Sequence, residues 1–204
     1  MSSKQFGPGK MKVVETRTNI LKATVVLLES GEGSGVRMTD IAKQAGISRQ
    51  AVYLYFSTRA ELLIAVTQYV DELGGVQERL AASRSATSGL ERLDAYIDAW
   101  GNYIPQISNI AIALLAMSDT DEEAATAWDE RMKAMRHGCH AVIKQLKADG
   151  KLSPDHTSQQ ATDILWTMLS VRNWQQLTIQ CKWSQKTYLK KIKALAKSVL
   201  IIAR

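Results

Sequence analysis

The chain has 204 residues, 46% hydrophobic and 23% charged, so it is long and apolar enough to fold around the core of one or two domains. Its longest apolar run, Ile110 to Met117, is far shorter than the roughly 20 residues needed to cross a bilayer, and two cysteines are too few for a disulfide framework. Because no charged start leads into an apolar signal core, we expect a soluble, cytoplasmic protein.

The formal net charge of +6 is spread unevenly along the chain. Residues 1–60 carry +5 and residues 168–204 carry +8, whereas the stretch between them is acidic. The pattern indicates two separate basic features, which permit a nucleic-acid partner without requiring one.

Apolar residues recur at spacings of three and four, and the three prolines leave long stretches without a helix breaker, which predicts an all-α fold. Residues 1–12 are mostly polar, include three lysines and are predicted to form a flexible basic arm. A first helix is expected from about Val13 to Glu29, closed by the glycine-rich stretch 31–35.

Two short helices are predicted next, with Gly46 in the turn between them. The first runs from Thr39 to Ala45, and the second has Ser48 as its N-cap and reaches about Tyr55. Apolar residues on both helices allow the pair to pack at a steep angle, as in a helix-turn-helix. In that motif the start of the second helix enters the major groove of DNA, so we expect DNA binding.

Arg49 and Gln50 lie at the exposed start of the second helix and have the side-chain types that make bidentate contacts with guanine and adenine, so we expect them to read bases. Neighbouring hydroxyls and cations are expected to bind phosphates and set the register. Alternatively, Tyr53 and Phe56 are core residues and Lys43 is merely solvated. The phosphate candidates are Thr39, Lys43, Ser48, Tyr53, Tyr55 and Arg59.

A longer helix is predicted from Thr58, and Gly74-Gly75 then break or kink it. The glycine pair is either a helix end or a hinge that transmits occupancy of a ligand site. A further helix from about Leu90 is predicted to stop at Pro105.

The apolar segment from Ile107 to Met117 is expected to form a buried central helix. The acidic run from Asp119 to Glu123 places carboxylates at the next helix start, where the helix dipole favours them. We therefore expect capping and solvation there rather than a metal or acid-base site. That helix is predicted to end at Gly150.

Aromatic and methionine side chains are concentrated in these central helices. Such a stripe usually packs in a core, but as a set it favours a pocket for a large apolar or aromatic ligand. The pocket candidates are Tyr96, Trp100, Tyr103, Met117, Trp128, Met132, Met135 and Trp166.

His137, Cys139 and His140 suggest a metal or thiol-imidazole site. Adjacent helical residues point about 100° apart, however, so His140 is poorly placed to act as a base for Cys139. The sequence places no third metal ligand beside the two histidines. We expect an exposed helix face, or else a polar pocket lining, and predict no metal, cofactor or catalytic residue.

Two last helices are predicted, over residues 156–180 and 184–203. The second has an apolar side, with Ile192 at its centre, that a dimer interface would explain. The opposite face would then be the solvated outer surface of the dimer. The alternatives are a membrane-surface stripe and a second nucleic-acid contact. That face carries Lys186, Lys190, Lys193 and Lys197.

Residues from about 15 to 65 resemble the DNA-binding domain of the TetR family of bacterial regulators. The resemblance lies in Ile20-Leu21 and Ala23, in Thr39-x-Ile41-Ala42-x-x-Ala45-Gly46-Ile47-Ser48, and in Tyr53-x-Tyr55-Phe56 with Leu62. Arg59 stands where the family usually has lysine, and the arginine still offers a positive charge to a phosphate. Gln50-Ala51-Val52 replaces a more usual Gly-Thr-Leu type, which bears on the operator that is read.

The resemblance implies a helix-turn-helix domain over residues 13–57 and a larger helical ligand-binding and dimerisation domain over residues 58–204. The last two helices would join a homodimer, and its symmetry requires a near-palindromic operator in double-stranded DNA. We predict a non-enzymatic transcriptional regulator, most simply a repressor released by a small-molecule effector, with no membrane partner. Control by a protein partner without a pocket, and a helical metal-binding or enzymatic bundle, are the alternatives.

Overall fold

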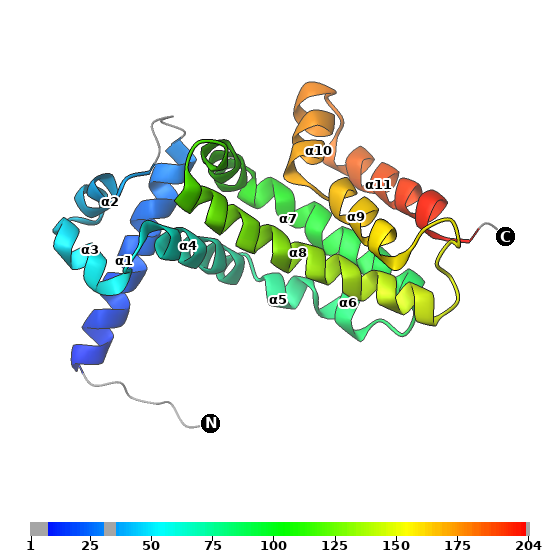
Figure 1. Ribbon diagram of the computed structural model, residues 1–204, viewed down its shortest axis with the longest axis horizontal. Helices are drawn as coiled ribbons and strands as arrows, with labels where there is room; N and C mark the ends of the chain where they lie inside the picture. Colours follow the sequence, from blue (N-terminus) through cyan, green and yellow to red (C-terminus); the bar gives the residue numbers. More distant parts are fainter. Residues whose placement is uncertain (1–7, 31–35, 203–204) are drawn as a thin grey trace. The chain divides into compact units, whose positions relative to one another are not determined.

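The computed structural model describes residues 8–30 and 36–202, and every regular element in these ranges is a helix, as predicted. No helix in the described ranges combines the length and the hydropathy needed to span a membrane. The elements, labelled in Figure 1 where there is room, are α1 (Pro8–Ser30), α2 (Met38–Ala45), α3 (Arg49–Tyr55), α4 (Arg59–Leu73), α5 (Val76–Arg79), α6 (Ala81–Ser85), α7 (Gly89–Ser118), α8 (Glu122–Ala148), α9 (Ser158–Met168), α10 (Val171–Gln175), the π-helix η1 (Gln176–Gln180) and α11 (Gln185–Leu200).

The described residues form two compact units. The first comprises the residues up to Tyr69 together with Ala113–Trp128, and the second comprises Val70–Ile112 and the residues from Asp129 onward. Helices α4, α7 and α8 therefore contribute residues to both units. The first unit includes more of the chain than the DNA-binding domain predicted over residues 13–57.

The first unit is built around α1, α2 and α3, the blue and cyan helices of Figure 1, which pack against one another. Ile20, Ile41, Val52 and Leu62, one from each of α1 to α4, are fully buried. Full burial of such a side chain stabilises the fold by roughly 1.5–3 kcal/mol. These four residues therefore fix the helix-turn-helix onto α1 and α4.

Helix α1 begins at Pro8 rather than at Val13, so part of the predicted basic arm is helical. Proline is favoured in the first turn because its φ suits a helix and no N–H is needed there. Residues 1–7 of the predicted arm and the glycine-rich stretch 31–35 lie outside the described residues.

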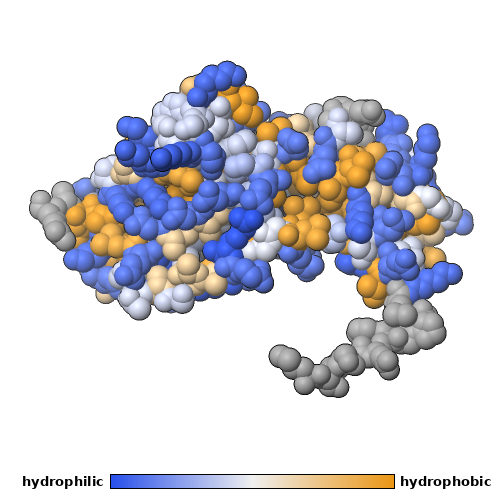
Figure 2. Space-filling view, turned by 180° about the vertical axis from the view of Figure 1, so that it is seen from behind, coloured by the Kyte–Doolittle hydropathy of each residue, from blue (hydrophilic) through white to orange (hydrophobic). Residues whose placement is uncertain are grey.

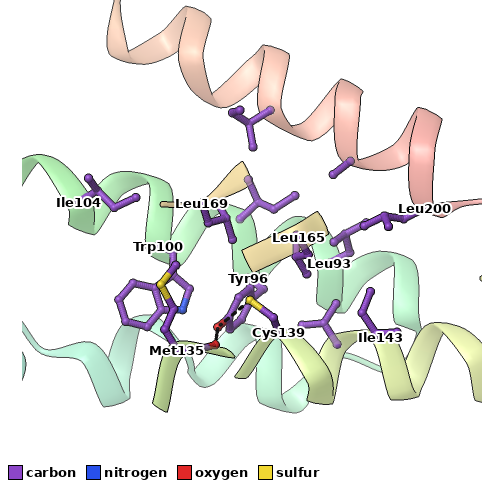
Figure 3. Close-up of a cluster of buried hydrophobic side chains, with 14 of the residues drawn as sticks. Leu93, Tyr96, Trp100, Ile104, Met135, Cys139, Ile143, Leu165, Leu169 and Leu200 are labelled. Carbon is purple, nitrogen blue, oxygen red and sulfur yellow. Dashed lines mark hydrogen bonds between the residues drawn. The ribbon is translucent and has the colours of Figure 1, made fainter. Parts of the chain in front are cut away.

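The second unit has one large core to which α7, α8, α9 and α11 contribute (Figure 3). Leu93, Ile143 and Leu165 are fully buried in it, and Leu200 closes it from α11. The apolar spacing along α7 and α8 thus buries one stripe of each helix in a shared interior.

Helix α7 is continuous although it contains Pro105, so the prediction that Pro105 ends the helix is wrong. Proline removes the N–H that would bond to the carbonyl oxygen of Gly101, four residues earlier. Nε2 of Gln185, in α11, donates to that oxygen instead, at 2.7 Å. The second half of α7 is also less buried than predicted, since only Ser108, Ile110 and Leu114 of its last twelve residues are buried.

The helix predicted over residues 156–180 is interrupted after Met168. Ser170 starts α10, because its hydroxyl oxygen accepts the N–H of Asn173 at 3.2 Å, and α10 runs into η1. Helix α11 ends at Leu200 rather than at residue 203, since Ile201 adopts an extended conformation.

Gly74 and Gly75 lie at the end of α4. Gly75 has a φ of 62°, in the left-handed region that favours glycine. A Cβ added to Gly74 would collide with the side chain of Tyr103. The glycine pair therefore marks a helix end, which is one of the two interpretations. A role as a hinge remains a hypothesis.

Candidate nucleic-acid interface and ligand site

Helices α2 and α3 form the predicted helix-turn-helix. Gly46 has a φ of 69° and its N–H bonds back to the last turn of α2. The hydroxyl oxygen of Ser48 caps α3 by accepting the N–H of Ala51 at 3.1 Å. Asn19 of α1, which had no predicted role, donates from Nδ2 to the carbonyl oxygen of Ala45 at 2.9 Å and ties α1 to the turn.

One face of α3 is buried through Val52, and the other is exposed through Arg49, Gln50, Tyr53 and Leu54. The guanidinium of Arg49 lies over the ring of Tyr53, with 5.5 Å between Cζ and the ring centroid. Its Nη2 also donates to the Tyr53 hydroxyl oxygen at 3.4 Å. Both predicted base-reading residues are therefore at the exposed start of α3, and Tyr53 holds the side chain of Arg49 along the helix.

The start of α3 borders a surface hollow of about 600 Å³. Of the predicted phosphate contacts, Thr39, Tyr53 and Arg59 line this hollow. The others lie outside it: Lys43 and Ser48 are exposed and Tyr55 is half-buried.

Three polar residues without a predicted role also line the hollow: Arg37, Ser57 and Thr58. They directly precede α2 and α4. Polar side chains before a helix start are a recognisable signal for a cap, and Thr58 accepts the N–H of Glu61 at 3.0 Å. The sequence therefore contained a signal that could have found them.

Arg59, predicted to bind a phosphate, is held within the chain, and its side chain is only 15% exposed. Its Nε donates to Oε2 of Glu123 at 3.1 Å, its Nη2 pairs with Asp121, and its Nη1 donates to the carbonyl oxygen of Val36 at 3.2 Å. Oε1 of Glu123 also accepts the backbone N–H groups of Arg59 and Ala60, at 3.1 and 3.2 Å. A carboxylate of the same chain thus occupies the start of α4.

Asp121 caps α8, as expected for the acidic run. Its Oδ1 accepts the N–H groups of Glu123 and Ala124 at 3.1 and 3.2 Å. Partial burial raises the pKa of this carboxyl, but the hydrogen bonds from Arg59, Ala124 and Glu123 outweigh burial, so the pKa of Asp121 is lowered. Asp121 therefore stays charged at neutral pH and joins the cap of α8 to Arg59.

Four pocket candidates lie together in the core of the second unit, as Figure 3 shows for Tyr96, Trp100 and Met135. The rings of Tyr96 and Trp100 meet edge to face, with centroids 6.3 Å apart, and the fourth candidate, Tyr103, lies 5.8 Å from Trp100. The Tyr96 hydroxyl donates to the carbonyl oxygen of Met135 at 3.0 Å. We call these four residues the aromatic cluster.

The other four candidates are dispersed. Trp166 is half-buried against the same core and Met132 is half-buried, whereas Met117 and Trp128 belong to the first unit. The structure therefore does not join all eight in one place. The buried indole N–H groups of Trp100 and Trp166 have no hydrogen-bond partner among the described residues.

The end of α4 is bound to the aromatic cluster. Oδ1 of Asp71 accepts hydrogen bonds from the Tyr103 hydroxyl at 3.0 Å and from Nη2 of Arg131 at 3.1 Å. The guanidinium of Arg131 lies 4.9 Å from the ring centroid of Trp100. Burial raises the pKa of Asp71, although Arg131 and Tyr103 oppose this change. A displacement of Trp100 or Tyr103 would therefore act on the last turn of α4.

The histidine and cysteine side chains of α8 do not converge. Cys139 is buried, which raises the pKa of its thiol to about 12, and its Sγ donates to the Tyr96 hydroxyl oxygen at 3.7 Å. His137 and His140 are exposed. Within residues 8–30 and 36–202, no three metal-ligating side chains come together.

The lysine face of α11 is not uniformly solvated. Lys193 and Lys197 form ion pairs with Asp98 and Asp94 of α7, each with 2.6 Å between nitrogen and oxygen, whereas Lys186 and Lys190 are exposed. On the apolar side, Ile192 is buried in the core of its own unit, whereas Leu195 is exposed. The chain's own core therefore explains the buried part of this side, and a dimer contact through the exposed part stays a prediction.

Comparison with known proteins points to one family. The family model described as bacterial regulatory proteins, tetR family, matches residues 20–66, which contain α2 and α3. The HTH-type transcriptional activator FasR of Mycolicibacterium smegmatis is 34% identical over 159 residues, covering 76% of this chain and 69% of FasR. The HTH-type transcriptional regulator CymR of Pseudomonas putida is 25% identical over 199 residues, covering 95% of this chain and 91% of CymR.

Other matches are shorter or purely structural. Nucleoid occlusion factor SlmA of Marinomonas sp. is 33% identical over 58 residues, so the match spans 28% of this chain and only 29% of SlmA. The crystal structure of a Rhodococcus sp. protein assigned to the TetR-family transcriptional regulators superimposes with a TM-score of 0.73 at 19% identity, covering 92% of this chain and 99% of that one. The similarity to this structure shows a shared fold.

Proposed function

The chain belongs to the TetR family of bacterial regulatory proteins and is a DNA-binding transcriptional regulator, and on this premise we propose that it is a homodimeric repressor, released from a near-palindromic operator by a small apolar or aromatic ligand. The observation that carries the ligand response is the binding of Asp71, at the end of α4, to Tyr103 and Arg131 beside Trp100. Helix α4 directly follows the recognition helix α3 in the chain.

Arg49 and Gln50 read bases in this proposal, because they are exposed at the start of α3 and have the fork and the amide that pair with guanine and adenine. Arg59 holds the start of α4 through Asp121 and Glu123, and reaches a phosphate only where DNA displaces them. Phosphates are bound by Thr39, Lys43, Ser48, Tyr53 and Tyr55, together with Arg37.

A symmetric dimer places its two recognition helices on successive turns of the major groove, roughly 34 Å apart, so the operator is a near-palindrome. We place the dimer contact on the last helices. In support, Ile179 of η1 and Leu195 of α11 are exposed apolar side chains. Figure 2 shows hydrophobic residues (orange) at the surface among hydrophilic ones (blue).

The aromatic cluster supports an apolar or aromatic ligand. The indole N–H of Trp100 is buried and has no acceptor in the described part of the chain. An unpaired buried donor costs about 1–3 kcal/mol. A ligand with an apolar body and one acceptor would pair this donor, and its entry would disturb the bonds that Tyr103 and Arg131 make to Asp71.

Activation is a second candidate function, because FasR is named a transcriptional activator. The two candidates differ in one measurement, the output of a reporter gene joined to the operator region. Deleting the regulator raises the output of a repressed promoter and lowers that of an activated one.

The test uses the full chain and the DNA that flanks its own gene. Binding of 1-anilinonaphthalene-8-sulfonate and of a panel of small aromatic compounds is followed by tryptophan emission, and operator release by gel shift. Trp100→Phe keeps an apolar ring without the N–H, so it should weaken ligand binding and leave operator affinity in the absence of ligand unchanged. Trp174→Phe is the control, because the Trp174 N–H already donates to Oε1 of Gln185 at 3.0 Å. Release by a protein partner but by none of the compounds would favour the partner-controlled alternative.

A further inference from the structure

Leu54 is the most exposed large hydrophobic side chain among the described residues, at 85% of its maximum. It lies in the seven-residue helix α3, which joins the core of the first unit through Val52, and the core continues with Phe56 directly after the helix. The fold therefore makes no use of the Leu54 side chain.

Leu54 belongs to the same surface as the proposed base-reading residues. Residues four apart lie one above the other on a helix. The exposed face of α3 therefore has two adjacent columns, Arg49 with Tyr53 and Gln50 with Leu54. In the first column, Tyr53 is in contact with the guanidinium of Arg49. In the second column, Leu54 offers only apolar surface next to an amide.

The major groove presents one apolar group, the C5-methyl of thymine. A leucine on the groove-facing side of α3 has no polar atom for the other base edges, so the methyl group is its complementary partner. One helix turn rises about 5.4 Å and one base step about 3.4 Å, so this thymine lies within one or two base pairs of the adenine contacted by Gln50.

We propose that Leu54 is a specificity-determining residue that reads a thymine methyl group in each operator half-site. The proposal rests on the proposed entry of α3 into the major groove. It predicts a preference for thymine over cytosine and over deoxyuridine at one position per half-site.

The test replaces each operator thymidine in turn by deoxyuridine, which removes only the methyl group. Fluorescence anisotropy then measures the affinity of the wild-type protein and of Leu54→Ala. At one position per half-site, deoxyuridine should lower the affinity of the wild type about fourfold, which is the effect of one buried methyl group. Leu54→Ala should bind the thymidine and the deoxyuridine operator equally well at that position. Because Leu54 is exposed, the variant should keep the circular-dichroism spectrum of the folded protein.

Leu73→Ala is the matched control, since Leu73 is 70% exposed at the end of α4, outside the recognition helix; it should keep the wild-type response to deoxyuridine. Indifference of the wild type to every substitution, or equal losses for the wild type and Leu54→Ala, would overturn the role of Leu54. Failure of the underlying proposal looks different: the Arg49→Ala/Gln50→Ala double variant would then bind the operator as tightly as the wild type.

Discussion

Substitutions of base-reading and of phosphate-binding side chains should change DNA affinity in different ways. Arg49→Ala or Gln50→Ala should weaken operator binding by about 1–3 kcal/mol and relax the sequence preference at one position per half-site. Lys43→Ala should weaken binding to all sequences and reduce the salt slope by about one, because one phosphate is no longer neutralised. Anisotropy titrations at several salt concentrations separate the two classes. An affinity decrease for Arg49→Ala that is the same on every sequence would contradict base reading.

Asp121 predicts an acid dependence of stability. Its pKa is lowered in the folded chain, so near that pKa the unfolded state binds more protons. The stability it contributes is present above the unfolded pKa of about 4 and is lost as pH falls through the folded value. Asp121→Asn should therefore reduce the fall in the free energy of unfolding between pH 7 and pH 3, measured by urea denaturation. The exposed Asp119→Asn is the control, and a wild-type pH profile for Asp121→Asn would refute the role.

The sequence could predict the surroundings of the α3 residues, but not those of Arg59. Arg49 and Gln50 follow Ser48 directly, so a local cap and the helical period were enough to place them at an exposed helix start. The partners of Arg59, Asp121 and Glu123, are 62 and 64 residues away. No periodicity connects such positions, and only the folded chain brings them together.

Helix α7 depends on a side chain from another helix. Gln185→Ala leaves the Gly101 carbonyl oxygen without its donor and the Trp174 N–H without its acceptor, and should cost at least about 1–3 kcal/mol of unfolding free energy. Pro105→Ala restores a backbone N–H that can reach this oxygen, so Gln185→Ala should cost less in that background. A double-mutant cycle by urea denaturation measures the coupling. Equal costs in both backgrounds would show that Gln185 does not replace the missing bond.

The predictable elements were those with local signals. The turn at Gly46 and the cap at Ser48 depend on their immediate neighbours and were predicted correctly. The continuation of α7 through Pro105 was not predicted, because Gln185 is 84 residues away from Gly101. The break at Ser170 was missed because its cap competes with an otherwise helical apolar pattern.

The proposed dimer contact on the last helices predicts that a substitution there changes the oligomeric state. Leu195→Glu places a charge at an exposed apolar site of α11 and should raise the dimer dissociation constant roughly tenfold or more, because an unpaired charge is costly in an interface. Sedimentation velocity measures this constant. Leu73→Glu is the control, since Leu73 is also exposed but lies on α4. An unchanged dimer in Leu195→Glu would place the contact elsewhere.

A dimer of this chain is proposed to read a near-palindromic operator through the exposed start of α3. DNase I footprinting of the DNA flanking its gene tests this reading, with the wild type and a folded Arg49→Ala/Gln50→Ala variant side by side. We predict one protected site with dyad symmetry and half-site centres roughly one helical turn, or a small number of turns, apart, with no protection by the variant. Protection of a site without dyad symmetry, or an unchanged footprint with the variant, would contradict the claim.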